Sequence, residues 1–137
     1  MSTVYSVDVQ VTAPVHDTEV TDRVADAITN LFPDAEVEQR PGELVAETHS
    51  MERFAERLAE QNIGPTAREV LRDGREGDTV SFALKKAAAF EGVINFAVGN
   101  PDELGDVHVR VRIEEPDAGA FIDYLVPAGG DADVSEE

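Results

Sequence analysis

Two segments near opposite ends of the chain alternate strictly between apolar and polar residues. The first runs from residue 5 to 12 and the second from 107 to 113, with valine, isoleucine or tyrosine at every second position. Because successive side chains of a strand point to opposite faces of a sheet, this period predicts two strands that bury one face and expose the other. A sheet with one covered face is the frame that the rest of the chain must fit.

Helical spacing of apolar residues follows the first of these strands. It predicts helices over residues 20–31, 54–63, 65–71 and 121–125. We expect Asp17 or Thr18 to cap the first helix and Ser50 to cap the second, and we expect Pro33 and Gly74 to end the first and third. These helices supply the cover for the sheet.

Shorter strands are expected between the helices. Residues 35–38 and 43–47 read as a hairpin around Pro41 and Gly42, while 79–84 and 93–98 read as strands separated by a bend or turn over 85–89. The mixture predicts an α+β fold in a single domain, residues 1–127, with a mostly antiparallel sheet and helices packed on one face. Residues 128–137 have little to bury and are expected to form an acidic disordered tail.

The charge of the chain is strongly unbalanced. Among its 137 residues, 29 Asp and Glu oppose 11 basic residues, nine of which are Arg, giving a net charge of -18. Such a surface is typical of proteins from halophiles that work in concentrated salt, where the Debye length falls to about 3 Å at 1 M. The alternative is a local acidic function, such as nucleic-acid mimicry or calcium binding. Acids spread along the whole chain without EF-hand spacing favour salt adaptation.

Several functional classes receive no support from the sequence. The chain has no cysteine, no signal-like N-terminus and no run of about 18 apolar residues, so we expect a cytoplasmic protein that does not contact a membrane. His16, His49 and His108 are scattered without metal-ligand or catalytic-triad spacing, and no glycine-rich phosphate loop occurs. We therefore expect no metal, no cofactor, no small-molecule substrate and no enzymatic activity.

Two basic motifs have a structural and a functional interpretation. Residues 74–77 match the GxxG loop with which KH domains hold nucleic acid, but a simple turn between helix and strand is favoured. Arg53 and Arg57 stand one helical turn apart, as do Arg68 and Arg72. They could hold phosphates, although pairing with neighbouring acids on the helix surface is favoured.

A polar sheet surface is the better binding candidate. Only one acid, Glu91, lies between Asp78 and Asp102, and both lysines of the chain fall in that interval. The uncovered faces of the strands are expected to bring together Ser6, Gln10, Thr79, Ser81, His108, Arg110 and Arg112, without net negative charge. That surface lacks the exposed aromatic side chains on which some RNA-binding sheets stack bases, which argues against readout of single-stranded bases and leaves recognition of the backbone or shape of structured RNA as an option. A structural explanation for the scarcity of acids in this interval is that buried strands carry few acids in any protein. The sequence does not distinguish this explanation from a binding surface.

The chain also resembles a known family. The likeness covers residues 4–127 and rests on Asp17-Thr18-Glu19, Asn30-Leu31-Phe32-Pro33, Thr66-Ala67-Arg68, the run 82–88 with Gly92 and Asn95-Phe96, Leu104-Gly105, and the run 122–127. These motifs resemble the archaeal uncharacterised protein family 0201, whose members are described as RNA-binding and share the fold of the large-subunit ribosomal protein that holds 5S ribosomal RNA. Lys86 matches the family lysine, whereas Lys85 and Ala87 replace the usual asparagine and glutamine.

The resemblance implies a ribosomal-protein-like α+β fold without catalytic activity. Together with the residues, it leads us to expect a non-catalytic RNA-associated protein of a halophilic archaeon that recognises structured RNA or a ribonucleoprotein. The expected RNA-binding residues are Lys85, Lys86, Arg68, Asn95, His108, Arg110 and Arg112. The alternative is a protein-interaction or regulatory subunit that forms a homodimer through an exposed strand edge and contacts no nucleic acid.

Overall fold

The two alternating segments of the sequence become neighbouring strands at the centre of one antiparallel sheet. A computed structural model describes residues 6–97, 105–115 and 117–126. Its six strands lie in the order β2-β3-β1-β6-β5-β4. They are β1 (Ser6–Pro14), β2 (Glu36–Arg40), β3 (Glu43–Thr48), β4 (Arg75–Glu76), β5 (Thr79–Lys85) and β6 (Asp106–Glu115). The expected tail, 128–137, lies outside the described residues.

The register of β1 against β6 explains why the alternation predicts the sheet so well. Val9 lies opposite Val111 and Val11 opposite Val109, so the valines of both strands point to the same face. Gln10 lies opposite Arg110 on the other face. Because a slip of one residue would turn every buried valine toward water, the apolar pattern fixes this pairing.

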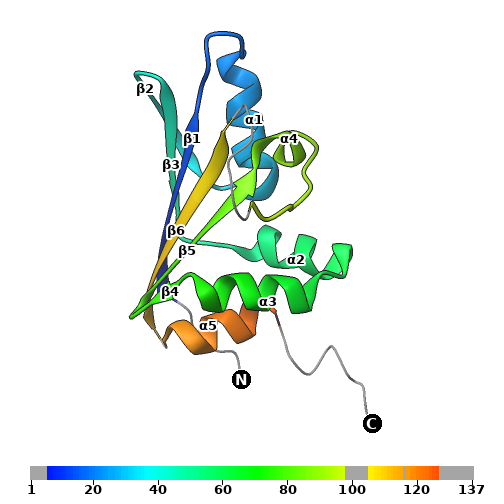
Figure 1. Ribbon diagram of the computed structural model, residues 1–137. Helices are drawn as coiled ribbons and strands as arrows, with labels where there is room; N and C mark the ends of the chain where they lie inside the picture. Colours follow the sequence, from blue (N-terminus) through cyan, green and yellow to red (C-terminus); the bar gives the residue numbers. More distant parts are fainter. Residues whose placement is uncertain (1–5, 98–104, 116, 127–137) are drawn as a thin grey trace.

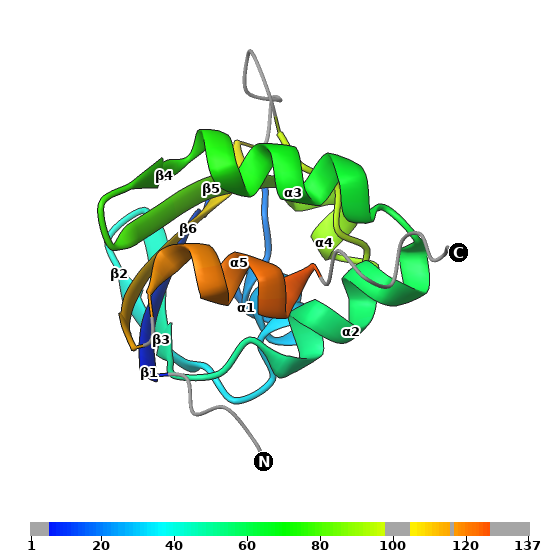
Figure 2. The ribbon, with the colours of Figure 1, turned by 90° about the horizontal axis from the view of Figure 1, so that it is seen from below.

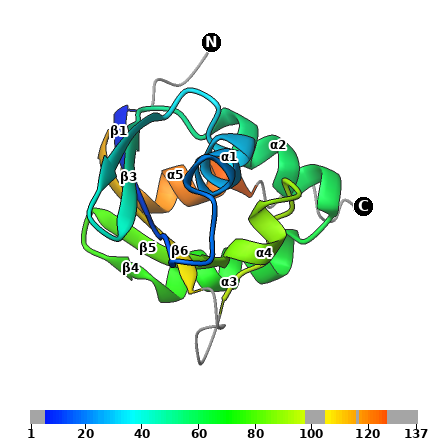
Figure 3. The same ribbon diagram turned by 90° about the horizontal axis from the view of Figure 1, so that it is seen from above.

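All helices of the described residues lie on the valine side of the sheet. Figure 1 shows the strands as one layer and the helices as a second layer beside it, and the views from both ends show the same arrangement (Figures 2 and 3). The helices are α1 (Thr21–Leu31), α2 (Glu52–Gln61), α3 (Gly64–Asp73), α4 (Lys86–Ala89) and α5 (Ala118–Leu125). The predicted α+β fold, with helices packed on one face, is confirmed.

A chain of phenylalanine rings joins the two layers. The ring centroid of Phe54 on α2 lies 5.6 Å from that of Phe32 and 5.5 Å from that of Phe82 on β5. Phe82 in turn lies 5.8 Å from Phe96. Aromatic contacts at these distances add to the stabilisation from burial itself.

No helix in the described part of the chain is long and apolar enough to cross a membrane.

The first two helices begin later than their capping residues suggest. Helix α1 starts at Thr21 with Val20 at its N-cap, so the expected cap at Asp17 or Thr18 is wrong. Val20 is 63% exposed, because it precedes the helix and does not belong to its apolar face. Met51 occupies the N-cap of α2, yet the Ser50 hydroxyl accepts a hydrogen bond from the Glu52 amide at 3.3 Å.

The segments around the GxxG motif and the lysines also depart in part from expectation. Gly74 ends α3, Arg75 and Glu76 form the short strand β4, which pairs with β5, and Gly77 occupies the turn between the two strands with φ of 63°. The favoured reading as a simple turn between helix and strand therefore holds only in part, because the motif forms a hairpin. Residues 86–89 form a helical turn, α4. The strand expected over 93–98 is wrong within the described residues, where only Phe96 makes a bridge, to Leu84.

Candidate nucleic-acid interface

The face of the sheet away from the helices carries rows of polar side chains. Residues opposite each other in an antiparallel sheet share a face, so the register defines each row. One row runs through Glu76, Thr79, Arg112 and Asp8. The next runs through Ser81, Arg110, Gln10, Glu47 and Glu36. The third runs through Ala83, His108, Thr12, Val45 and Glu38.

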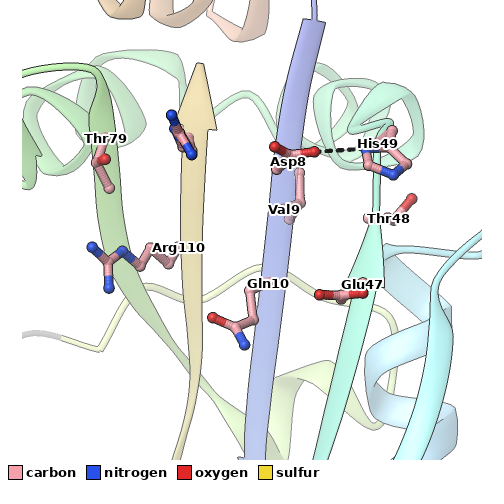
Figure 4. Close-up of a pocket in the computed structure, with 9 residues that line it drawn as sticks. Asp8, Val9, Gln10, Glu47, Thr48, His49, Thr79 and Arg110 are labelled. Carbon is pink, nitrogen blue, oxygen red and sulfur yellow. Dashed lines mark ion pairs between the residues drawn. The ribbon is translucent and has the colours of Figure 1, made fainter. Parts of the chain in front are cut away.

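A depression of about 480 Å³ lies over the first two rows. Figure 4 shows the side chains of Arg110 on β6, Gln10 on β1 and Glu47 on β3 on this face. The depression is shallow and crosses four strands, so it suits an extended ligand better than an enclosed small molecule.

Arg110 and Arg112 differ from most other arginines of the chain. Arg40, Arg53, Arg57 and Arg68 each pair with a carboxylate. Arg110 and Arg112 are exposed, and within the described residues neither guanidinium has a hydrogen bond or an ion pair. In a chain with such an excess of acids, two adjacent guanidinium groups therefore stay available for an external anion.

A histidine explains why Asp8 does not neutralise Arg112, although the two residues lie opposite each other. The Asp8 Oδ1 atom lies 3.0 Å from Nδ1 of His49, at the end of β3, and Figure 4 shows Asp8 turned toward that ring. The same nitrogen lies 3.0 Å from the Val7 carbonyl oxygen. In this position the Asp8 carboxylate lies on the β3 side of β1, and Arg112 has no ion pair among the described residues.

The charge of the whole face differs from the sequence-based expectation. The prediction of a surface without net negative charge is wrong, because β2 and β3 add Glu36, Glu38 and Glu47 to it. It holds only for the half built by β5 and β6, where Thr79, Ser81 and His108 accompany the two arginines and the exposed Glu114 accepts a hydrogen bond from the Ser6 hydroxyl. The face is therefore divided into a basic and an acidic half.

Lys85 and Asn95 extend the basic half. Lys85 is the last residue of β5 and shares the side of the sheet on which Ser81 lies. Its backbone amide donates to the Asn95 carbonyl at 2.8 Å, so the exposed Asn95 lies next to it along the edge of β5. Five of the seven predicted RNA-binding residues are thereby brought together on one side of the sheet: Lys85, Asn95, His108, Arg110 and Arg112.

Arg68 is not part of this surface. It lies on α3, on the helical side, where its guanidinium donates to Asp123 Oδ1 at 2.7 Å and to the Val126 carbonyl oxygen. Its side chain is only 14% exposed. The prediction of Arg68 as an RNA contact is therefore corrected: it ties α3 to the end of α5.

Lys86 is a structural lysine and not an exposed one. Its side chain is 0% exposed, and Nζ donates to the Pro14 carbonyl at 2.5 Å and to Glu19 Oε1 at 2.9 Å. A buried ammonium with two partners cannot contact RNA, so the prediction for Lys86 is corrected. The sequence pattern around β5 could not reveal that Lys86 is buried, because this lysine directly follows the strand and its partners, Pro14 and Glu19, are far away in sequence.

The environment of Glu19 favours its charged form. Burial alone raises the pKa of this carboxyl, but the hydrogen bond from the His16 amide at 2.9 Å and the Lys86 ammonium outweigh it. The net result is a pKa below the ordinary value. Glu19 and Lys86 therefore form a buried ion pair between the segment before α1 and the start of α4.

Other surfaces are less suited to an anion. Arg53 and Arg57 pair with Glu56 and Glu60 at 3.2 and 2.9 Å, which confirms the favoured reading of surface pairing on α2. A second cavity, of about 490 Å³, lies between α2 and α5 and is lined by apolar residues and by two acids, Glu52 and Glu56. Among the described residues, no group of three or more His, Asp or Glu side chains could hold a metal ion.

Two residues that shape the interface are missing from the sequence-based prediction. Asp8 lies on the polar face of β1, so the alternation could have identified it. His49 comes after the end of β3, and no sequence signal places it beside Asp8. Only the pairing of β1 with β3 brings the two side chains together.

Comparisons with known proteins agree with this fold. A family model described as RNA binding matches residues 8–114. The chain is 37% identical over 123 residues to a UPF0200/UPF0201 protein of Archaeoglobus fulgidus, a match that covers 89% of this chain but only 38% of that longer protein. It is 31% identical to a UPF0201 protein of Methanothermobacter thermautotrophicus, which covers 94% of this chain and 96% of the relative.

A solved structure shows the same architecture. The crystal structure of a UPF0201 protein, 36% identical in sequence, superposes with a TM-score of 0.82 and covers 88% of this chain and 93% of its own.

Proposed function

Because the chain belongs to the archaeal UPF0201 family and matches a family model described as RNA binding, we propose that it binds structured RNA or a ribonucleoprotein through the uncovered face of its sheet. It acts without catalysing a reaction, and its net charge of -18 fits an archaeon with concentrated salt in its cytoplasm.

One observation carries this proposal. Arg110 and Arg112 are exposed side by side on β6 without an acidic partner among the described residues, while most other arginines pair with acids. Guanidinium groups bind phosphate oxygens through two parallel hydrogen bonds. A surface that keeps two of them unpaired is suited to a phosphate backbone.

The salt dependence of binding is part of the proposal. An acidic protein in molar salt gains little affinity from counterion release, so hydrogen bonds and close fit must supply the affinity. Binding is therefore expected to persist or strengthen from low to molar potassium chloride. Basic RNA-binding proteins lose affinity over the same range.

Filter binding of total cellular RNA in molar potassium chloride tests the proposal. The double variant Arg110→Gln/Arg112→Gln is expected to lose at least about tenfold in affinity, since each guanidinium hydrogen bond to phosphate contributes strongly. The matched control, Arg40→Gln/Arg53→Gln, removes the same charge from arginines that pair with acids and is expected to bind like the wild type.

The same experiment tests the alternative function, a dimerising protein-interaction subunit, and the expectation that the protein catalyses no reaction. If the wild type retains no RNA, and sizing in the same salt gives a dimer, the protein is a dimerising interaction subunit. RNA recovered intact after long incubation is expected for a non-catalytic binder, and shortened RNA would contradict that part of the proposal.

A further inference from the structure

The division of charge on the uncovered face restricts how RNA can lie on it. Along the row of Arg110, the side chains change from a hydroxyl and a guanidinium on β5 and β6 to Glu47 and Glu36 on β3 and β2. A backbone that crossed the strands would place phosphates over these two carboxylates. Like charges in direct contact oppose binding even where salt screens longer distances.

The composition of the face gives a second reason why an RNA strand would not run across the strands of the sheet. Sheets that bind single strands across their width stack bases on exposed aromatic rings. In the rows defined above, no described residue is Phe, Tyr or Trp, and His108 contributes the one aromatic ring, an imidazole. Phe82 and Phe96 are buried on the helical side. Because a single imidazole cannot stack a run of bases, the described rows offer contacts mainly to a sugar-phosphate backbone.

Along β6, the spacing of basic side chains suits that backbone. Residues two apart in a strand project on the same face about 6.8 Å from each other, close to the spacing of successive phosphates. Arg112, Arg110 and His108 occupy three such positions. A ligand that follows β6 from His108 to Arg112 therefore meets a donor at each step and avoids Glu36 and Glu47, and its path ends before Glu114, which accepts a hydrogen bond from the Ser6 hydroxyl.

A second line of donors runs beside the first. Thr79 lies opposite Arg112, and Ser81 lies opposite Arg110. Neighbouring strands are about 4.8 Å apart, which places these hydroxyls beside each phosphate position, where a ribose lies. A hydroxyl next to a ribose can hydrogen-bond its 2′-hydroxyl group, the group that distinguishes RNA from DNA.

We infer that the β5–β6 strip, defined as Thr79, Ser81, His108, Arg110 and Arg112, binds one strand of a base-paired RNA segment lengthwise. The arginines hold its phosphates, the hydroxyls contact its 2′-hydroxyl groups, and the bases stay paired with the second strand. The shallow minor groove of A-form RNA presents 2′-hydroxyls in this way. The inference rests on the proposed function and adds the class of RNA and its direction on the sheet.

His49 is a positioning residue in this arrangement. Because the contact with His49 holds the Asp8 carboxylate away from Arg112, His49→Leu is expected to let Asp8 pair with Arg112 and weaken RNA binding. Adding Asp8→Asn to His49→Leu is expected to restore binding. A histidine that only stabilised the end of β3 would not show this rescue.

The test compares three probes of one sequence by fluorescence anisotropy in molar potassium chloride: an RNA duplex, a DNA duplex and single-stranded RNA. The RNA duplex is expected to bind at least about tenfold more tightly than the other two, since several hydrogen bonds depend on its shape. Thr79→Val/Ser81→Ala is expected to reduce the preference for RNA over DNA duplex to less than about threefold.

Substitutions on the acidic half of the face distinguish RNA that lies along β6 from RNA that crosses the strands. Glu36→Gln/Glu47→Gln is expected to leave RNA-duplex binding within about twofold, because screening at molar salt restricts repulsion to direct contacts. Clearly tighter binding would overturn the lengthwise placement. Equal binding of all three probes that still requires Arg110 and Arg112 would overturn the inference but keep the proposed function. Binding of none of the probes or of cellular RNA would overturn both.

Discussion

The Lys86 ammonium lies 2.9 Å from Glu19 Oε1, although 67 residues separate them and both side chains are buried. The pair joins the segment before α1 to the start of α4, and the second bond of Lys86, to the Pro14 carbonyl, fixes the end of β1. Both residues belong to motifs that carry the family resemblance. In this chain the two motifs therefore meet in one buried ion pair and do not form two surface sites.

Breaking this pair is expected to destabilise the protein strongly. Lys86→Met leaves the Glu19 carboxylate buried without its partner, and such a loss costs about 3–5 kcal/mol in free energy of unfolding. Urea denaturation in molar potassium chloride measures it. Lys85→Met, at a half-buried position one residue earlier, is the control and is expected to cost less than about 1 kcal/mol.

A double change tests the origin of that loss. Lys86→Met/Glu19→Leu removes both charges and is expected to recover part of the stability lost in the single variant, because no buried charge then lacks a partner. A double variant that is less stable than Lys86→Met would contradict this explanation.

The lowered pKa of Glu19 predicts a pH dependence of stability. A carboxyl with a depressed pKa in the folded state stabilises the fold above its ordinary pKa of 4.5, and this stabilisation is lost as the pH falls through the folded value. The difference in free energy of unfolding between wild type and Glu19→Gln should stay constant near neutral pH and shrink below about pH 4.5. Urea titrations at a series of pH values measure it, and a constant difference down to acid unfolding would refute the assignment.

The close approach of α3 to β5 makes Gly74 irreplaceable. A β-carbon at Gly74 would lie 1.9 Å from the Ser81 carbonyl oxygen, so Gly74→Ala requires the backbone of the helix or the strand to move. Gly77→Ala meets no neighbouring atom but has φ of 63°, which costs about 1–2 kcal/mol. Thermal unfolding should show a larger loss for Gly74→Ala, and equal losses would be the contradicting result.

Repulsion among acids predicts that salt stabilises the fold. The net charge of -18 should weaken the native state in dilute buffer, so the unfolding midpoint is expected to rise from low to molar potassium chloride. Glu36 and Glu47 face each other across β2 and β3. Glu36→Gln/Glu47→Gln should raise low-salt stability by about 0.2–1 kcal/mol and flatten the salt dependence. A midpoint independent of salt would contradict the prediction.

The sequence by itself determined the sheet and its two faces. In β1 and β6, strict alternation specifies which side chains are buried, because strand geometry leaves no other way to cover the valines. The exposed positions of Arg110 and Arg112 follow from the same rule. Helix starts were less predictable, since Ser50 can satisfy an amide of α2 from outside the N-cap.

The tertiary structure alone decided which basic residues are available. Lys85 and Lys86 are adjacent and look equivalent in sequence, but the end of β5 turns one toward the uncovered face and buries the other against Glu19. Arg68 is likewise taken up by Asp123, and Arg112 is left free because His49 holds Asp8. Ion pairs between distant segments depend on strand register and helix packing, and local periodicity carries no information about them.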